Sequence, residues 1–146
     1  MAWVVTNKGD QECRRLADRH YSRQKIGSRQ FCRPGRNLVL KTEEADAVWV
    51  TWSGIRDDGI DAWECTIFRN ESTHLSSVLI REAVELTLRE WGQPPPDGII
   101  TYVDQTKVRS ANPGFCFLKA GWRKSGRSKR RNLLRLVAPF YEGGGE

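Results

Sequence analysis

The 146-residue chain has no apolar run that approaches the length of a membrane span. A membrane-spanning helix needs about 18 or more consecutive apolar residues. The N-terminus also lacks the layout of a signal peptide. The composition excludes collagen, coiled-coil and membrane classes, so we expect a cytoplasmic protein that has no membrane partner.

Cysteine and histidine are scarce, with four and two residues respectively. Cys13, Cys32, Cys65 and Cys116 are far apart, and no two have the spacing of a zinc-binding pair. A chain of this length can bury a core without disulfides. We therefore expect no metal and four reduced thiols, with Cys65 and Cys116 in the core and Cys32 in a polar loop.

The 24 basic and 18 acidic residues give a net charge of +6, and 38% of the chain is hydrophobic with six tryptophans. This composition predicts one ordered domain over residues 1–140, followed by a flexible tail over residues 141–146.

Basic residues are concentrated in two segments, residues 13–36 and 122–135. If both lie on one face, they form a surface that binds polyanions; otherwise they are solvated surface. Tyr21, Phe31 and Trp122 are interspersed with them and are suited to stacking on nucleic-acid bases. The nucleic-acid-binding candidates are Arg23, Lys25, Arg29, Arg33, Arg36, Arg127, Lys129, Arg130 and Arg131.

Hydrophobic periodicity predicts a mixed α/β domain with the order β-α-β-β-β-α-β-α-β-β. The expected strands are Ala2–Thr6, Leu38–Lys41, Ala47–Ser53, Ala62–Phe68, Ile99–Val103, Trp122–Arg123 and Leu133–Ala138. The expected helices are Asp10–Tyr21, Leu75–Trp91 and a short third helix within Asn112–Gly121. For the third helix we expect Asn112 as N-cap, Pro113 as first residue and Gly121 just past the end. The polar segment Ser22–Arg36 is long for a loop that binds nothing, and Lys124–Arg131 reads as a basic turn.

The start of the longest predicted helix is the first candidate site. Its N-terminus favours phosphate, because its first N–H groups are unpaired and the helix dipole is positive there. Arg69, at the end of the preceding strand, could bind phosphate with two hydrogen bonds. Ser76 and Ser77 could bind phosphate through their hydroxyls, or a serine such as Ser72 or Ser76 could merely cap the helix.

His20 and Asp104 are the second candidate pair. A histidine is the commonest general base, although one at a helix end is often only structural. Asp104 follows a buried strand, a frequent place for catalytic residues in open α/β sheets, although an aspartate there can also simply form a turn.

Several stretches, taken together, resemble the GNAT acyltransferase superfamily, and within it the phage Mom-like DNA-modification branch. They are His20-Tyr21-Ser22, Phe68-Arg69-Asn70-Glu71, Leu75–Ile80, Tyr102-Val103-Asp104 with Val108-Arg109, and Asn112–Trp122. The resemblance implies a GNAT-like domain with a mixed, mostly antiparallel twisted sheet flanked by helices. It also implies a V-shaped opening between the fourth and fifth strands that holds acetyl-CoA or a related acyl-CoA.

The resemblance further implies transfer of an acyl-type group, such as acetyl or carbamoylmethyl, to an amine of a base in double-stranded DNA. The amine is the exocyclic nitrogen of adenine or belongs to a modified pyrimidine. The cofactor-binding residues carried over are Arg69, Asn70, Ser76, Ser77 and Asn112. Those at the reacting centre are His20, Asp104, Tyr21 and Tyr102.

Two departures from the superfamily pattern are visible. No glycine lies between Arg69 and Ser77, where its pyrophosphate signature has two small residues. The last helix offers Phe115, Cys116 and Phe117 rather than a tyrosine, so Tyr102, Tyr21 or water would have to protonate the departing thiolate.

Two other functions remain open from the sequence. One is a GNAT N-acetyltransferase that acts on a protein or small-molecule amine. The other is a non-enzymatic DNA-binding protein with a degenerate cleft. The sequence also leaves the oligomeric state open, a homodimer included.

Overall fold

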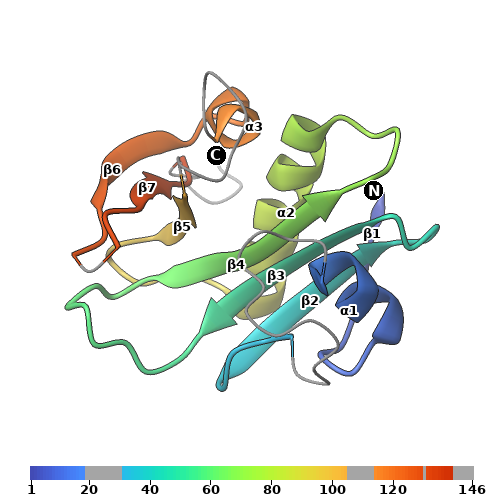
Figure 1. Cartoon of the computed structure of the whole chain (residues 1–146), viewed down its shortest axis with the longest axis horizontal. Helices are drawn as coiled ribbons and strands as arrows, with labels where there is room; N and C mark the ends of the chain where they lie inside the picture. Colours follow the sequence, from blue (N-terminus) through green and yellow to red (C-terminus); the bar gives the residue numbers. More distant parts are fainter. Residues whose placement is uncertain (19–30, 105–113, 130, 140–146) are drawn as a thin grey trace.

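The computed structural model describes residues 1–18, 31–104, 114–129 and 131–139 (Figure 1). Its seven strands form one sheet in the order β1-β2-β3-β4-β5-β7-β6. The strands are β1 (Trp3–Thr6), β2 (Arg36–Thr42), β3 (Ala47–Ser53), β4 (Trp63–Asn70), β5 (Ile99–Val103), β6 (Arg123–Arg127) and β7 (Leu134–Val137). The helices within the described ranges are α1 (Gln11–Asp18), α2 (Ser76–Trp91) and α3 (Phe115–Lys119). The predicted mixed α/β class and element order are confirmed.

The sheet is antiparallel except where β4 pairs with β5. Two neighbouring parallel strands need a crossover connection, because the chain must return to the same end of the sheet. Helix α2 makes this crossover. Its first turn therefore lies near the carboxyl end of β4, and its last turn lies near the amino end of β5.

Both faces of the sheet are covered, and alternate residues of each strand point to opposite faces. On β3, Trp49 belongs to the core under α2 and α3, whereas Val48 and Val50 pack with the residues of α1. Figure 1 shows α1 and α2 on opposite sides of the sheet. On α2, Arg81, Glu85 and Arg89 form an exposed polar stripe.

Helix α1 begins one residue after its predicted start, because Asp10 is the capping residue. Its carboxylate accepts hydrogen bonds from the main-chain N–H groups of Glu12 at 2.9 Å and Cys13 at 3.2 Å. It also pairs with Lys41 at 2.7 Å. Burial raises the pKa of Asp10, but hydrogen bonds from Lys41 and Thr6 outweigh it and lower the pKa to about 2.

The start of α3 differs from the prediction. Gly114 is the N-cap, with φ of 77° in the left-handed region, so the predicted capping by Asn112 and helix start at Pro113 are wrong. A Cβ at Gly114 would lie 2.8 Å from Leu136 Cδ1, so close packing on the sheet selects glycine here. Asn112 and Pro113 lie outside the described residues. Gly121 follows the helix end as predicted, and its N–H donates to the Leu118 carbonyl at 3.0 Å.

The last hairpin is also longer than expected. Strand β6 runs over Arg123–Arg127, through the first half of the predicted basic turn, and pairs with β7. Its residues are mostly exposed. It is an edge strand, where charged side chains are favoured because they discourage pairing with other chains. Hydrophobic alternation could not reveal a strand whose faces are both polar.

Because Gly114 is closely packed, Gly114→Ala should lower the free energy of unfolding more than Gly59→Ala does. Both glycines have similar positive φ values, but the space around Gly59 is open. Left-handed backbone costs an alanine about 1–2 kcal/mol, and the clash at Gly114 adds about 1–3 kcal/mol. Urea denaturation should separate the two variants, and equal losses would contradict the packing argument.

The cap on α1 predicts that Asp10→Ala lowers the free energy of unfolding by about 1 kcal/mol near pH 6. Because the folded-state pKa is lowered to about 2, this contribution is complete above the unfolded pKa of about 3.9. It is then lost as the pH falls towards 2. Urea denaturation of both proteins between pH 6 and pH 2.5 measures the difference. A constant difference over this range would contradict the assignment, and Glu43→Ala, at an exposed turn, is the control.

Candidate functional site at the carboxyl ends of β4 and β5

The carboxyl ends of β4 and β5 lie at one edge of the sheet, because the two strands are parallel. Strand β4 ends at Asn70 and leads into α2 through residues 71–75. Strand β5 ends at Val103, and Asp104 follows at once. In open α/β sheets this edge commonly holds the ligand.

Strands β4 and β5 stop pairing well before they end. Their pairing covers only Trp63–Cys65 and Ile99–Thr101, whereas β4 continues for five more residues. A β-bulge lies at this point, because β3 pairs with Cys65 and Ile67 but skips Thr66. Thr66 Oγ1 is buried and has no hydrogen-bond partner in the structure. A buried polar atom without a partner is uncommon, and it marks this point as a place where a ligand could bind.

The loop between β4 and α2 is shaped by the side chain of Asn70. Its Nδ2 donates to the His74 carbonyl at 2.8 Å and to Ser76 Oγ at 2.9 Å. Its Oδ1 accepts from the Ser72 N–H at 2.9 Å. Asn70 therefore gives this glycine-free loop a defined conformation.

The first turn of α2 contains no acidic residue, and its N-cap, Leu75, makes no side-chain capping hydrogen bond. Neither Ser72 nor Ser76 is the cap, so that alternative interpretation is wrong. The first N–H groups of a helix have no partner within the helix, and the dipole places positive charge there. The start of α2 is thus suited to binding an anion.

Exposed apolar side chains lie near the start of α2. Leu75 is 71% exposed, Val78 is 40% exposed and Phe115, at the start of α3, is 52% exposed. Helix α3 packs beside α2, where Arg81 donates to the Lys119 carbonyl at 3.1 Å. Apolar surface next to an anion site suits a ligand that has both an apolar arm and phosphates.

Arg69 and Glu71 form an ion pair at 3.0 Å, with side chains 40% and 30% exposed. Exposed ion pairs contribute only about 0–1 kcal/mol. The Arg69 guanidinium is exposed enough for a phosphate to reach it.

Asp104 lies near the basic segment between β6 and β7. Arg131 Nη2 is 3.9 Å from Asp104 Oδ2, and the two side chains are 58% and 13% exposed. The structure therefore brings a predicted nucleic-acid-binding residue to a predicted catalytic residue. Tyr102 is half-buried on β5.

Arg33 and Arg36 lie at the other end of the strands, near the amino end of β4. Arg33 pairs with buried Glu64 at 3.3 Å, close to the amino end of β4. The Arg36 guanidinium lies 4.4 Å from the ring centre of Trp91, the last residue of α2. The structure does not bring these two arginines to Asp104 and Arg131.

Two aromatic residues expected to stack on bases belong to the core instead. Phe31 is 6% exposed and packs in the core under α1, and Trp122 is 3% exposed. The Trp122 and Phe117 ring centres are 4.9 Å apart. The stacking prediction is wrong for both, because periodicity cannot distinguish a core aromatic within a basic segment from a surface one.

Seven of the candidate residues lie outside the described part of the chain. They are His20, Tyr21, Arg23, Lys25, Arg29, Asn112 and Arg130. Arg127 and Lys129 are described, and both are exposed in the β6–β7 hairpin.

All four cysteines are free thiols. Cys65 is buried as predicted, whereas Cys116 is only half-buried against the core. Burial raises the pKa of Cys13 to about 12, and it raises the pKa of Cys65 and Cys116 as well. Among the described residues, no three His, Cys, Asp or Glu side chains are grouped to hold a metal ion.

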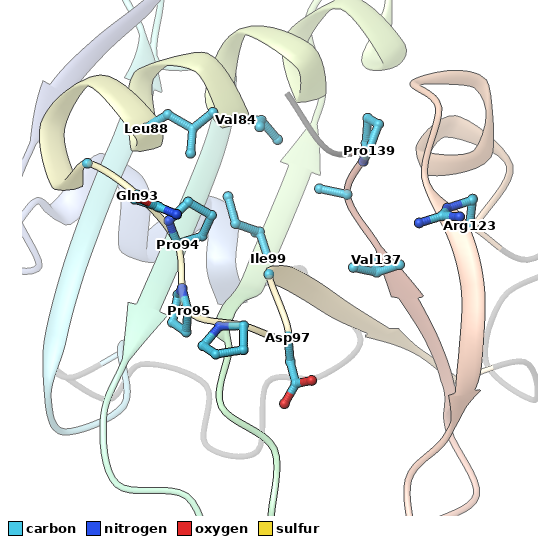
Figure 2. Close-up of a pocket in the computed structure, with 14 residues that line it drawn as sticks. Val84, Leu88, Gln93, Pro94, Pro95, Asp97, Ile99, Arg123, Val137 and Pro139 are labelled. Carbon is cyan, nitrogen blue, oxygen red and sulfur yellow. The ribbon is translucent and has the colours of Figure 1, made fainter. Parts of the chain in front are cut away.

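A pocket of about 790 Å³ lies at the other end of α2, between its last turns, the loop to β5 and strands β6 and β7 (Figure 2). No motif in the sequence predicts this pocket, because its lining comes from segments that are far apart in the chain. The run of three prolines, Pro94–Pro96, follows the end of α2 and forms part of the wall.

No family model, curated protein or solved structure matches this chain. None of the helices in the described ranges is long and apolar enough to cross a membrane.

The burial of the thiols predicts slow labelling of the folded protein by an aromatic disulfide reagent. Cys13 and Cys65 should react only after unfolding, because the attacking thiolate is disfavoured by burial. Mass spectrometry of labelled peptides, with and without urea, checks this. Rapid labelling of either cysteine in the native protein would contradict the described packing.

Proposed function

We propose that this protein is a GNAT-like acyltransferase that takes its donor, an acyl-CoA, at the start of α2 and modifies an amine of a DNA base. The observation that carries the proposal is the separation of β4 from β5 after Cys65 and Thr101, beside a helix start that contains no acid. The mixed, mostly antiparallel sheet, with helices on both faces, supports the proposal.

The donor's phosphates would bind the N–H groups at Ser76 and Ser77, at the positive end of the helix. Asn70 would keep the loop in shape, as its hydrogen bond to Ser76 Oγ suggests. Arg69 would add a charged contact when it leaves Glu71. The exposed side chains of Leu75, Val78 and Phe115 would cover the apolar part of the donor.

The acceptor would approach Asp104 from the side of the β6–β7 hairpin. The position of Arg131 near Asp104 supports this direction, because a cation there could hold a backbone phosphate next to the reacting centre. Arg127 and Lys129 are exposed in the same hairpin. A base within a duplex would have to be flipped out to reach Asp104.

The transfer would proceed by attack of the amine nitrogen on the thioester carbonyl carbon. The new C–N bond forms as the nitrogen loses a proton to a base, and the C–S bond then breaks. The thiolate finally takes a proton. Two residues are candidates for receiving or orienting the amine proton. Asp104 lies within the described part of the chain, and His20 is proposed from the sequence alone. Thr66 Oγ1 would supply a hydrogen bond near the point where the strands diverge.

A second function is favoured by the positions of four of the basic and aromatic residues. Arg33 and Arg36 lie at the other end of the strands, and Phe31 and Trp122 are buried. All the donor-site features would serve equally well in an enzyme that acylates a protein or small-molecule amine. Modified nucleosides decide between these two functions.

Mass spectrometry of nucleosides from DNA co-expressed with the protein tests the proposal. We expect a nucleoside with an added acyl-type mass, and we expect its loss in Asp104→Asn. Glu85→Gln, on the exposed stripe of α2, is the matched control and should retain it. Unmodified DNA together with acylated amines in a peptide or small-molecule panel would favour the second function.

The donor site predicts opposite effects of Ser77→Glu on stability and on CoA binding. A carboxylate in the first turn of α2 should raise stability by about 0.3–1 kcal/mol through the helix dipole. The same charge should weaken CoA binding at least tenfold by repelling phosphate. Thermal unfolding with and without CoA measures both effects, with Ser77→Ala as control. If Ser77→Glu binds CoA as tightly as the wild-type protein does, the phosphates do not bind at this position.

The hairpin predicts a strong salt dependence of DNA binding. Replacement of Lys129, Arg130 and Arg131 by glutamine should reduce the slope of log K against log salt by up to about three. A control variant with the same charge change replaces Lys8, Arg15 and Arg89, which are exposed away from the hairpin. Equal slopes in the two variants would exclude the hairpin from phosphate contact.

A further inference from the structure

The pocket at the last turns of α2 has an apolar floor. Val84 on α2 is 1% exposed and Ile99 at the start of β5 is 3% exposed. Leu88, Val137 and Pro139 form half-buried walls. Figure 2 shows the Val84, Leu88 and Ile99 side chains around one hollow. Val137 pairs with Ile100, so it lies on the other face of the sheet from Ile99 and lines the pocket where the strands end. A volume of about 790 Å³ is within the usual range for small-molecule sites, roughly 300–1,000 Å³.

The rim of this pocket is preformed. Pro94, Pro95 and Pro96 restrict the loop, and the Gly98 N–H donates to the Pro95 carbonyl at 2.8 Å. The Asp97 N–H donates to the Asp61 carbonyl at 2.9 Å, and Asp97 Oδ2 accepts from the Asp61 N–H at 2.7 Å. A ligand would therefore pay little conformational entropy to order this wall.

Two charged side chains at the rim, Asp97 and Arg123, differ in whether they could contact a ligand. Asp97 uses its carboxylate to hold the loop against Asp61. Arg123, at the start of β6, is exposed and lines the pocket, and Figure 2 shows its guanidinium turned towards Val137. The apolar hollow thus has a cation at its edge, which is complementary to an organic anion.

We propose that this pocket binds a small organic acid with an apolar body, such as an arylalkyl carboxylate, whose carboxylate meets Arg123. The body would lie against Val84, Leu88 and Ile99. This site is at the opposite end of α2 from the proposed donor site, so it stands independently of the proposed function.

Three probes with the same body and different head groups test the proposal: 4-phenylbutyrate, 4-phenylbutylamine and 4-phenylbutanamide. Methyl NMR spectra of the full-length protein should show shifts of Val84, Leu88 and Ile99 on titration with the acid. The acid should bind more tightly than the amide, and the amine should bind most weakly. Absence of these methyl shifts, or an amine that binds as tightly as the acid, would overturn the proposal.

Two variants locate the contacts. Arg123→Gln should weaken binding of the acid about fivefold, the value for one exposed charge pair of about 1 kcal/mol, and should leave the amide unchanged. Arg127→Gln, in the same strand, should change neither. Val137→Trp should fill the pocket and abolish binding of both the acid and the amide while thermal unfolding shows a folded protein. Retained binding in Val137→Trp, or equal effects of the two arginine variants, would overturn the assignment.

A last variant distinguishes an external ligand from the chain itself. Phe140 and Tyr141 follow the pocket-lining Pro139 directly in the sequence. If the acid binds to the wild-type protein, the proposal stands. If it binds only after Phe140→Ser and Tyr141→Ser are introduced together, the occupant is the chain's own C-terminal segment and the proposal fails.

Discussion

The short parallel pairing between β4 and β5 is the constraint on which the candidate site depends. The two strands share only three residue pairs, and the bulge at Thr66 lies next to the last of them. Because the strands are parallel, α2 must cross over between them. The crossover brings the unpaired N–H groups of its first turn to the edge where the strands have separated. A longer ladder would have closed this part of the sheet.

The two ends of α2 have different chemical surroundings. Its first turn has no acidic side chain and lies at the edge that holds Asp104 and Arg131. Near its last turn, Arg36 packs on Trp91, and the adjoining pocket is largely apolar with Arg123 at its rim. One helix thus separates a place suited to phosphates from a place suited to an apolar body.

The strands and helices were largely predictable, because buried runs such as Ala47–Ser53 and Ile99–Val103 have a clear hydrophobic pattern. Strand β6 was predicted too short, since an exposed edge strand is polar on both faces. The capping prediction for α3 failed at Gly114, where packing against Leu136 decides the residue. The roles of Phe31 and Trp122 were misjudged for a related reason: burial depends on neighbours from distant segments.

Local chemistry could be deduced from residue order alone: an overall positive charge, a mixed α/β arrangement, a helix start without glycine and an aspartate after a buried strand. The neighbours of a residue across the sheet could not be deduced in this way, because they depend on the strand order and on the pairing register. Only the tertiary structure shows that Arg131 lies near Asp104 and that Arg33 pairs with Glu64. It also left Thr66 Oγ1 buried without a partner, since a bulge arises from the mismatch of two strands and belongs to neither sequence segment.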